Sequence, residues 1–359
     1  MEKLRFGIIG CGSIANSKHI PALLKQPRAE IVALCDIVED KAKAAAKRFE
    51  LDGAKIYTDY KDLCDNQEID VVHICTPNVV HCEITLAAIA GGKHVHCEKP
   101  LACTWAETQK MISAAKKAGK QLTSGLQWRF RENCFYIRDL VQSGALGDVY
   151  YVKSQQLRRR MLPAYGTYTS KAGNGGGVLM DGGPHSIDLA MWLTGNYKPK
   201  SVRGVIMDKM KFETEANMSG PWDPTKFDVE DSAFALLTME NGMAVSIEVA
   251  WLINMIQEAP SIVASLAGTK AGVDMVGAGM NPARVNMVYG GRTATLVPDL
   301  AGPLVAPFGP TGADYEMIHW IDAILNDKEP AVRAEEAAVV TRVIEGIYKS
   351  AESGETVYF

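Results

Sequence analysis

The stretch "LRFGIIGCGSIA" at residues 4–15 decides the expected fold of the N-terminal part of the chain. Its first seven residues form a mostly apolar run, which is typical of a parallel strand that is buried on both faces. Gly10 and Gly12 follow in a GxGxxA pattern, where glycine permits a tight turn and lets another molecule approach the main chain closely. The stretch therefore predicts a strand, a turn and a helix in direct succession.

Further apolar runs and helical patterns continue this alternation. The runs lie at residues 30–36, 70–76, 93–97 and 121–126, and the clearest helices lie at 79–92 and 104–119. Thr104 and Glu107 stand at capping-box spacing at the start of the second helix, and Gly119 ends it. Strands that alternate with helices indicate a doubly wound parallel sheet, so we expect an α/β dinucleotide-binding (Rossmann) domain over residues 1–125.

The chain beyond residue 125 has a different pattern, with strands that lack helical crossovers. Strands are predicted at 148–157, 201–212 and 231–239, and helical patterns return at 313–326 and 335–352. Asn241-Gly242 is a strong hairpin signal, and a second hairpin is predicted over 285–297. We therefore expect an α+β domain over residues 126–359 with a large, open, mostly antiparallel sheet.

The overall composition narrows the class of protein. A chain of 359 residues is long enough for two domains, and its net charge of -4 argues against a nucleic-acid-binding protein. No apolar run approaches the roughly 20 residues of a membrane helix, and the first residues do not resemble a signal peptide. The eight cysteines form no CxxC pair, which favours reduced thiols over a disulfide framework or a zinc site. We expect a cytoplasmic protein without a metal or a membrane partner.

The glycine turn and the end of the second strand indicate a dinucleotide cofactor. A pyrophosphate would sit at the positive end of the helix that the turn opens. The residues expected to hold it are Gly10, Gly12, Ser13 and Ile14. Asp36, at the end of the second strand, is suited to accept both ribose hydroxyls and would repel a 2′-phosphate. NAD is therefore expected rather than NADP, although Lys41 and Lys43 lie close by.

A second stretch, "GNGGGVLMDGGPHSIDLAMWLTG" at residues 173–195, carries titratable groups on one helix face. Spacings of four, three and four residues separate Asp181, His185, Asp188 and Trp192. Either carboxylate could orient the imidazole as part of an active site, and an ordinary capped helix would show the same pattern. Pro184 lies within this pattern, so the helix either begins near Gly183 or bends beside His185.

Several ordered motifs make the chain resemble a known family. "GIIGCGSIA", "CTPNVVH", "GKHVHCEKPLA" and "GGGVLMDGGPHSID" occur in the order typical of the glucose–fructose oxidoreductase, inositol dehydrogenase and MocA-like (Gfo/Idh/MocA) family. The resemblance covers nearly the whole chain. It implies a Rossmann domain followed by an α+β domain, an NAD cofactor, and oxidation or reduction of a sugar, cyclitol or sugar derivative.

The resemblance also implies roles for individual residues. Cofactor contacts are implied for Thr76, Pro77, Asn78, His81, Glu98, Lys99 and Gln127. Among these, Glu98 would approach the nicotinamide ribose, and Lys99 would reach the substrate hydroxyl that is oxidised. Gln127 stands where the family often has asparagine, and it would touch the nicotinamide or the sugar. Asp181 and His185 match the family's D-x-G-x-H segment, which supplies the other half of the active site.

These residue types suit the oxidation of a secondary alcohol. His185 would be the base that accepts the hydroxyl proton, because an unperturbed imidazole titrates near neutral pH. Asp181 would orient the ring and stabilise its charged form, and Lys99 would stabilise the developing oxyanion. Asp188 is the alternative partner of His185. The joint presence of Lys99, Asp181 and His185 argues against a non-enzymatic sugar or nucleotide sensor, which has no need of all three.

The candidate substrate contacts point to a sugar derivative. They are Lys99, Gln127, Trp128, Arg159, Tyr165, Asp181 and His185. Aromatic rings suit a pyranose or an aromatic aglycone, and Arg129 beside Trp128 offers hydrogen bonds. The triplet Arg158–Arg160 would either bind an anionic group or form a solvated strand end or a subunit contact.

The expected activity is NAD-linked oxidation of a glucoside at C3, which gives a 3-keto sugar, with an aromatic aglycone as one possible feature. An inositol, another cyclitol or a free sugar is the alternative substrate, and an NAD-dependent glycosidase of the same family is an alternative activity. The apolar strands at 234–239 and 244–251 would leave one face of an open sheet uncovered, so we expect a homo-oligomer.

Overall fold

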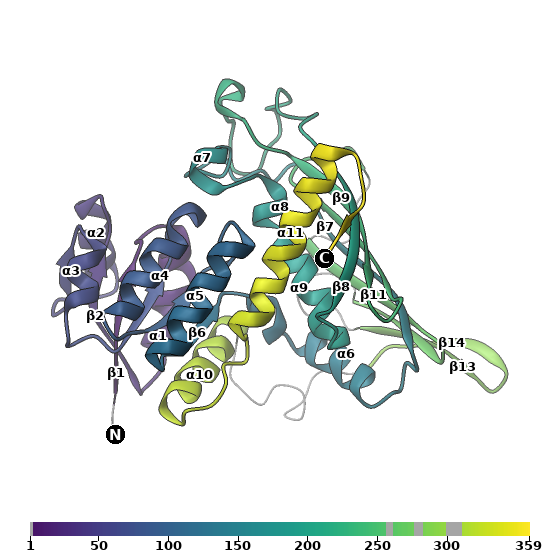
Figure 1. The fold of residues 1–359 in the computed structure, drawn as a ribbon, viewed down its shortest axis with the longest axis horizontal. Coiled ribbons are helices and arrows are strands. Elements are labelled where there is room, and N and C mark those ends of the chain that lie inside the picture. The colour runs from purple at the N-terminus through teal and green to yellow at the C-terminus, as the bar shows by residue number, and fades with distance from the viewer. Residues whose placement is uncertain (1–2, 256–260, 276–282, 299–310) are drawn as a thin grey trace. The chain divides into compact units, whose positions relative to one another are not determined.

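The computed structural model describes residues 3–255, 261–275, 283–298 and 311–359 (Figure 1). The chain forms two compact units. The first contains Met1–Phe130 and Phe308–Thr341, and the second contains Arg131–Pro307 and Arg342–Phe359. Among the helices of the described ranges, none combines the length and the apolar composition that a bilayer-spanning segment requires.

A six-stranded parallel sheet forms the first unit. Its strands are β1 (Leu4–Ile9), β2 (Ala29–Cys35), β3 (Lys55–Tyr57), β4 (Val71–Ile74), β5 (His94–Cys97) and β6 (Leu122–Ser124). The order across the sheet is β3-β2-β1-β4-β5-β6, and all neighbouring strands run parallel. The predicted doubly wound sheet is confirmed. Strand β3 was not predicted, because three residues are too few to show a periodic pattern.

The helices of the first unit come from both ends of the chain. They are η1 (Ala15–His19), α1 (Ile20–Leu24), α2 (Glu39–Arg48), α3 (Tyr60–Asp65), η2 (Asn78–Val80), α4 (His81–Ala90), α5 (Trp105–Ala118), η3 (Gln127–Phe130) and α10 (Gly312–Leu325). The predicted capping box of α5 is confirmed. The Thr104 hydroxyl accepts the Glu107 N–H at 3.2 Å, and the Glu107 carboxylate accepts the Thr104 N–H at 3.0 Å.

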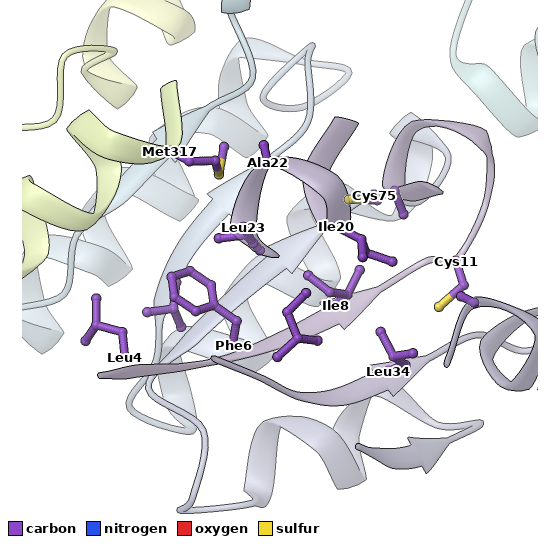
Figure 2. Close-up of a cluster of buried hydrophobic side chains, with 14 of the residues drawn as sticks. Leu4, Phe6, Ile8, Cys11, Ile20, Ala22, Leu23, Leu34, Cys75 and Met317 are labelled. Atoms are coloured by element: carbon purple, nitrogen blue, oxygen red, sulfur yellow. The ribbon is translucent and has the colours of Figure 1, made fainter. Parts of the chain in front are cut away.

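The core of the first unit joins β1 to α1 and α10 (Figure 2). Phe6 and Ile8 of β1 are fully buried, and Leu23 of α1 and Met317 of α10 belong to the same apolar cluster. Each such side chain contributes about 1.5–3 kcal/mol when it leaves water. The sequence had assigned α10 to the segment 126–359, whereas its apolar face packs in the first unit.

A nine-stranded sheet forms the second unit. Its strands are β7 (Val149–Leu157), β8 (Pro199–Met207), β9 (Ser232–Met239), β10 (Ala244–Ala250), β11 (Ser261–Gly268), β12 (Ala271–Asp274), β13 (Arg284–Tyr289), β14 (Arg292–Leu296) and β15 (Val357–Tyr358). The order is β14-β13-β12-β11-β7-β10-β9-β8-β15, and in it β7 and β10 run parallel whereas the other neighbours run antiparallel. The predicted, mostly antiparallel sheet is confirmed. The strand predicted over 201–212 is too long, because β8 ends at Met207 and the chain then turns.

Glycine turns close the two predicted hairpins. Gly242 has a φ of +88° between β9 and β10. Gly290 and Gly291, with φ of +58° and +74°, join β13 to β14. Two successive positive φ angles match the twist of the flanking strands, which is why glycine is favoured at both positions. Both hairpin predictions are confirmed.

Helices cover one face of this sheet. The helical segments of the second unit are α6 (Glu132–Gln142), α7 (Lys171–Asn174), α8 (Val178–Asp181), α9 (Gly183–Thr194) and η4 (Pro224–Lys226), and α11 (Ala334–Ser353) begins in the first unit and ends in the second. Helix α9 packs against β7, β10 and β11 and is buried along nearly its whole length. Neighbouring residues of a strand point to opposite faces, so Leu237 is buried while Leu236 is exposed.

Candidate functional site

The two glycines of the turn after β1, Gly10 and Gly12, are required for different structural reasons. Gly10 has a φ of +90°, and a Cβ atom there would lie 2.6 Å from the carbonyl oxygen of Cys75. A side chain at Gly10 is therefore excluded by the close passage of the loop after β4. A Cβ atom on Gly12 would meet nothing within 4 Å, so the main chain at Gly12 is open to a ligand.

The first turn of the helix that follows the glycine turn has the polar groups to bind an anionic group. Ser13 and Ile14 form its first turn. The side-chain amide of Asn16 donates to the carbonyl oxygens of Cys11 and Gly12 at 2.8 Å each. These bonds occupy the carbonyl groups of the turn, and the N–H groups of a first helical turn favour a phosphate. Asn16 was not predicted, although a polar amide just after a glycine turn is a recognisable signal.

Asp36 connects the end of β2 to the glycine turn. Its Oδ2 accepts the N–H of Cys11 at 2.9 Å, and its Oδ1 accepts the N–H of Val38 at 2.9 Å. A carboxylate oxygen has two lone pairs, so both oxygens retain capacity for ribose hydroxyls. Lys43, a cation that could have favoured a 2′-phosphate, forms an ion pair with Glu39 at 2.9 Å.

The loop after β4 contains a buried hydroxyl oxygen without a described hydrogen-bond partner and leads into a buried histidine that joins two loops. Thr76 Oγ1 is buried and has no hydrogen-bond partner among the described residues. Pro77 is exposed and Asn78 is partly exposed. His81 is fully buried, with Nδ1 2.8 Å from the carbonyl oxygen of Pro100 and Nε2 3.0 Å from that of Thr76. His81 thus links the loops after β4 and β5 and offers no surface of its own to a ligand.

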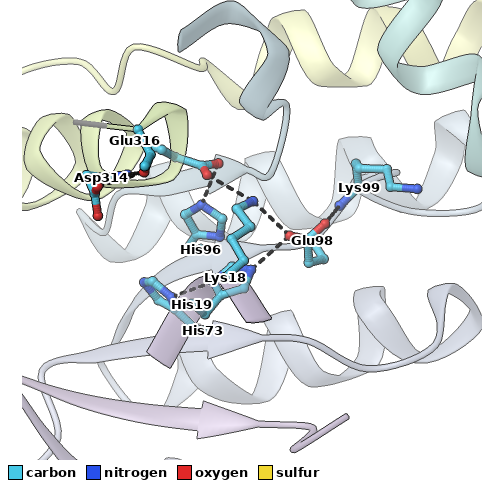
Figure 3. Close-up of polar contacts among 9 residues, drawn as sticks. Lys18, His19, His73, His96, Glu98, Lys99, Asp314 and Glu316 are labelled. Atoms are coloured by element: carbon cyan, nitrogen blue, oxygen red, sulfur yellow. Dashed lines mark hydrogen bonds and ion pairs between the residues drawn. The ribbon is translucent and has the colours of Figure 1, made fainter. Parts of the chain in front are cut away.

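Glu98 lies just beyond β5 and holds the main chain at Lys99 (Figure 3). Its Oε1 accepts hydrogen bonds from Lys18 Nζ at 3.0 Å and from His19 Nε2 at 2.8 Å. Its Oε2 accepts the Lys99 N–H at 3.0 Å. Burial raises the pKa of a carboxyl group, but Lys18 and His19 outweigh this effect and hold the pKa of Glu98 well below its ordinary value. The side chain of Lys99 points away from these groups.

The short helix η3 provides a second buried oxygen without a described hydrogen-bond partner. Gln127 Oε1 is buried and has no hydrogen-bond partner in the part of the chain that the structure describes. Trp128 is largely buried. Arg129 is fully buried, donates to the Ala331 carbonyl and forms an ion pair of 2.5 Å with Glu336. The suggestion that Arg129 binds a sugar is therefore wrong, because its guanidinium is committed to holding η3.

These features of the first unit fit NAD. The main chain is open at Gly12, and a carboxylate stands at the end of β2. The buried oxygens of Thr76 and Gln127 lack a protein partner within the described ranges, and an unsatisfied buried polar atom is costly unless a ligand or water meets it.

In the second unit, Asp181 and His185 lie on either side of a helix break. Helix α8 ends at Asp181, and α9 begins at Gly183 with Pro184 in its first turn. Proline fits there because the first N–H groups of a helix have no partner within it. The sequence left open whether Pro184 begins or bends the helix, and the structure shows that α9 begins there.

The burial of the two candidate carboxylates differs. Asp181 keeps 12% of its side chain exposed, and its Oδ2 accepts the indole N–H of Trp251 at 2.8 Å. Asp188 is 1% exposed and accepts a long hydrogen bond of 3.5 Å from the Tyr197 hydroxyl. His185 is also largely buried. Of the two carboxylates, Asp181 has the surface that a substrate could reach.

The glycine run before α8 is anchored by a residue that the sequence did not reveal. The buried carboxylate of Glu230 accepts the N–H groups of Gly177 and Leu179 at 3.0 and 2.9 Å and the hydroxyl of Tyr348 at 2.8 Å. A Cβ atom on Gly177 would overlap the main chain of Glu230, and one on Gly176 would overlap the Tyr348 hydroxyl. The glycines therefore permit close packing around Glu230, which positions α8 and its last residue, Asp181.

Aromatic rings connect Asp181 to an exposed tyrosine. The Trp251 indole, which bonds to Asp181, is in edge contact with Tyr168 at 6.5 Å between ring centroids. Tyr168 is in edge contact with Tyr165 at 5.6 Å, and Tyr165 is 54% exposed. We call Trp251, Tyr168 and Tyr165 the aromatic row.

The three arginines of the triplet have different surroundings. Arg158 Nη1 lies 3.7 Å from Asp181 Oδ2. Arg160 donates to Asn254 Oδ1 at 2.8 Å, and Arg159, the arginine selected from the sequence, is exposed. The structure thus places Arg158 closest to a candidate catalytic group, which the sequence could not decide among three adjacent residues.

The chain belongs to the Gfo/Idh/MocA oxidoreductase family. The model of that family's NAD-binding Rossmann fold matches residues 4–126, and the model of its C-terminal alpha/beta domain matches residues 138–359. The expected family, the oxidoreductase class and NAD as the cofactor are confirmed.

Individual relatives extend over nearly the whole chain. It is similar to D-glucoside 3-dehydrogenase of Escherichia coli (strain K12), with 32% identity over 359 residues, which cover 99% of this chain and 97% of the relative. Among solved structures, aldose-aldose oxidoreductase from Caulobacter crescentus, complexed with glycerol, matches with a TM-score of 0.82, 28% identity and complete coverage of both chains. Levoglucosan dehydrogenase in complex with NADH shares the fold, with a TM-score of 0.85, 22% identity and 99% coverage of each chain.

Proposed function

We propose that this enzyme oxidises a secondary hydroxyl of a glucoside, at C3, and transfers the hydride to NAD. The observation that carries the proposal is the 32% identity with D-glucoside 3-dehydrogenase, because the similarity covers 99% of this chain and 97% of that relative. The matches to inositol 2-dehydrogenases cover between 53% and 68% of the chain and therefore give weaker support for a cyclitol substrate.

The cofactor site in this proposal is formed by the first unit. Gly12, Ser13 and Ile14 would bind the pyrophosphate through main-chain N–H groups, and Asp36 would accept the ribose hydroxyls. Thr76, Asn78 and Gln127 would supply further polar contacts, and the buried oxygens of Thr76 and Gln127 favour this role. Bound NAD supplies the hydride acceptor of the reaction.

The remaining chemistry requires a base, an orienting group and a stabilised oxyanion. His185 would take the proton of the substrate hydroxyl while the hydride leaves the same carbon, so the products are a ketone, NADH and a protonated imidazole. Asp181 would stabilise that imidazolium, and Lys99 would donate to the substrate oxygen as negative charge develops on it. The Trp251 indole and the nearby Arg158 support the ionised form of Asp181.

The surroundings of Asp181 favour a glycoside over a small alcohol. In the aromatic row Trp251 is fully buried, whereas Tyr168 is partly exposed and Tyr165 is exposed. The two tyrosine rings, which connect to Asp181 through Trp251, offer flat apolar surface that suits a pyranose or an aryl aglycone. Arg158 and the exposed Arg159 would give hydrogen bonds to substrate oxygens. Trp128 retains little exposed surface for such a contact.

Mass spectrometry of the products tests the proposal. The protein would be incubated with NAD and, separately, an aryl glucoside, glucose and inositol, and the Lys99→Met variant would serve as the control. A glucoside product that has lost two hydrogen atoms, together with NADH, is expected. Oxidised inositol beside unchanged glucosides would contradict the glucoside assignment, and free aglycone without net NADH would indicate a glycosidase instead.

The open face of the nine-stranded sheet supports a homo-oligomer. Val205 of β8 and Leu236 of β9 are 45% and 52% exposed on the face opposite Leu237. A second copy of the chain would cover such apolar positions. Light scattering at micromolar concentration checks this, and a monomeric mass would contradict it.

A further inference from the structure

Glu98 belongs to a cluster of buried titratable side chains in the first unit (Figure 3). Its members are Lys18, His19, His73, His96, Glu98 and Glu316, and we call them the buried cluster. All of them have at most 7% of their surface exposed. Lys18 Nζ lies 3.0 Å from Glu98 Oε1 and 2.9 Å from Glu316 Oε2, so one ammonium group bridges two carboxylates.

Four elements of the first unit bring these residues together. The π-helical turn η1 ends with Lys18 and His19, and both of these consecutive residues are buried. His73 of β4 and His96 of β5 are direct neighbours in the parallel sheet, and their rings stack at 4.6 Å. Helix α10 adds Glu316, whose Oε1 accepts from His96 Nε2 at 3.2 Å.

The three histidines do not have the geometry of a metal site. A ring nitrogen binds a metal ion along its lone pair, so the ion must lie in the plane of every ring that binds it. The planes of His73 and His96 are stacked and inclined by only 30°, so they do not intersect at a bonding distance from both rings. The Nδ1 atoms of His19 and His73 are 3.0 Å apart, which is a hydrogen bond.

The hydrogen bonds of the cluster instead run toward Glu98. His19 Nε2 donates to Glu98, which leaves His19 Nδ1 as the acceptor of the Nδ1–H of His73. Burial, reinforced by Lys18, lowers the pKa of His19 to about 4, so this histidine is neutral. The described contacts of Glu98 are thus one ammonium, one neutral imidazole and the Lys99 N–H.

The bridging ammonium determines the charges of both glutamates. Burial alone would lower the pKa of Lys18, but Glu316 and Glu98 raise it above its ordinary value. Burial alone would raise the pKa of Glu316, but Lys18 and His96 lower it to about 2. Lys18, Glu98 and Glu316 are therefore all ionised at neutral pH, and each carboxylate holds Lys18 from one side.

We infer that Glu316 is a positioning residue for Lys99, acting through Lys18 and Glu98. Glu316 holds the Lys18 ammonium, Lys18 fixes Oε1 of Glu98, and Oε2 of Glu98 holds the main-chain N–H of Lys99. A displacement of Lys18 would rotate the Glu98 carboxylate and shift the main chain from which the Lys99 ammonium extends. The inference rests on the proposed role of Lys99 at the substrate hydroxyl.

The test compares Glu316→Gln with a matched substitution in the same helix. Glu316→Gln removes one charge and nearly preserves volume, whereas Asp314→Asn removes a charge of α10 that pairs with Lys25 at 3.0 Å. At saturating NAD and sugar, we expect kcat of Glu316→Gln to fall about tenfold, because small displacements of a catalytic group are costly. We expect the sugar KM and the NADH dissociation constant to stay within about twofold, and Asp314→Asn to resemble the wild type.

A charge-balanced double variant separates positioning from stability. Lys18→Met leaves two buried carboxylates without their cation, and adding Glu316→Gln removes one of them. The double variant should regain part of the Tm that Lys18→Met loses, while kcat stays low because nothing replaces Lys18 at Glu98. Recovery of kcat together with Tm would mean a purely structural role and would overturn the inference.

The Lys99→Met variant distinguishes a failure of the positioning role of Glu316 from a failure of the catalytic role of Lys99. If Lys99→Met is inactive and Glu316→Gln keeps kcat within about twofold of wild type, the inference is wrong and the proposed function stands. If Lys99→Met itself retains turnover, the proposed catalytic role of Lys99 and the inference that rests on it are both wrong. An inactive Lys99→Met beside a selective fall in kcat for Glu316→Gln supports both.

Discussion

Glu98 of the first unit and Glu230 of the second are equally buried, at 6% and 5% exposed, and each holds a segment that carries a proposed catalytic residue. Glu98 holds the main chain at Lys99, and Glu230 holds the start of α8, which ends at Asp181. Their partners differ in charge. Glu98 is bound by the Lys18 ammonium, whereas the described partners of Glu230 are main-chain N–H groups and the Tyr348 hydroxyl.

This difference reverses the effect of burial on ionisation. Burial raises the pKa of Glu230 above its ordinary value, because its neutral donors compensate only in part. The same burial is outweighed at Glu98 by Lys18, and the pKa of Glu98 is well below its ordinary value. Similar burial thus gives opposite shifts, and the presence of a buried cation decides between them.

The largest expected effects test whether both anchored segments are catalytic. Lys99→Met should lower kcat about 10²–10³-fold through loss of oxyanion stabilisation, and His185→Ala should lower it about 10²–10⁴-fold through loss of the base. Steady-state kinetics at saturating NAD and sugar measures both, with NADH fluorescence titration to show that the cofactor still binds. Near-normal turnover in both variants would show that neither Lys99 nor His185 has the proposed catalytic role.

The next effect concerns stability at the charged anchor. Lys18→Met should destabilise the protein by about 3–5 kcal/mol, because it leaves buried carboxylates without a counter-ion. Lys55→Met is the control, since Lys55 and its partner Glu68 are both exposed and an ion pair between exposed side chains contributes little to stability. Guanidinium denaturation measures both losses. Equal losses in the two variants would show that the buried cation has no special role.

A smaller effect is the pH dependence of stability, which should differ between Glu230 and Glu98. Because the pKa of Glu230 is raised, ionisation costs stability above that pKa, and the cost is relieved as the pH falls through it toward 4.5. Wild type should therefore gain stability relative to Glu230→Gln on acidification from pH 8 to 5, with a slope below roughly 1.4 kcal/mol per pH unit. Denaturation at several pH values measures this, and a difference that does not vary with pH would contradict it.

The charged anchor should respond in the opposite direction and at lower pH. Glu98 and Glu316 have depressed pKa values, so their stabilisation is complete above the ordinary glutamate value of 4.5. It is lost as the pH falls below 4.5 and through the pKa of about 2 of Glu316. In the charge-balanced Lys18→Met/Glu316→Gln variant, this acid-range loss should be reduced.

The smallest effect tests how Asp181 is held. Trp251→Phe removes the hydrogen bond from the indole N–H to the Asp181 carboxylate. Such a bond to a charged group is worth about 1.5–3 kcal/mol before solvent replaces it. With water able to reach the partly exposed Asp181, we expect a loss of about twofold to tenfold in kcat/KM. Trp222→Phe is the control, since the Trp222 indole donates to the Lys211 carbonyl instead. Equal kinetics of the two variants would exclude a role for the indole N–H.

Sequence patterns predicted the elements whose causes are local. The GxGxxA turn, the capping box of Thr104 and Glu107, and the hairpin at Gly290 and Gly291 each depend on residues a few positions apart. Strand β3 and the parallel pairing of β7 with β10 were missed, since three residues carry little pattern and pairing depends on distant segments. The residues near Asp181 were predicted in part, because Asp181 and His185 share one stretch whereas Trp251 is remote in the sequence.

The amino-acid sequence by itself determined the Rossmann sheet, the mostly antiparallel second sheet, the family and the cofactor, because periodicity, turn residues and ordered motifs are properties of short segments. Only the tertiary structure decided that α10 packs in the first unit and that Glu316 shares Lys18 with Glu98. It also decided that Glu230 and Tyr348, 118 residues apart, anchor the glycine run. A buried charge is stable only beside partners that compensate its lost hydration, and those partners come from wherever the fold brings the chain together.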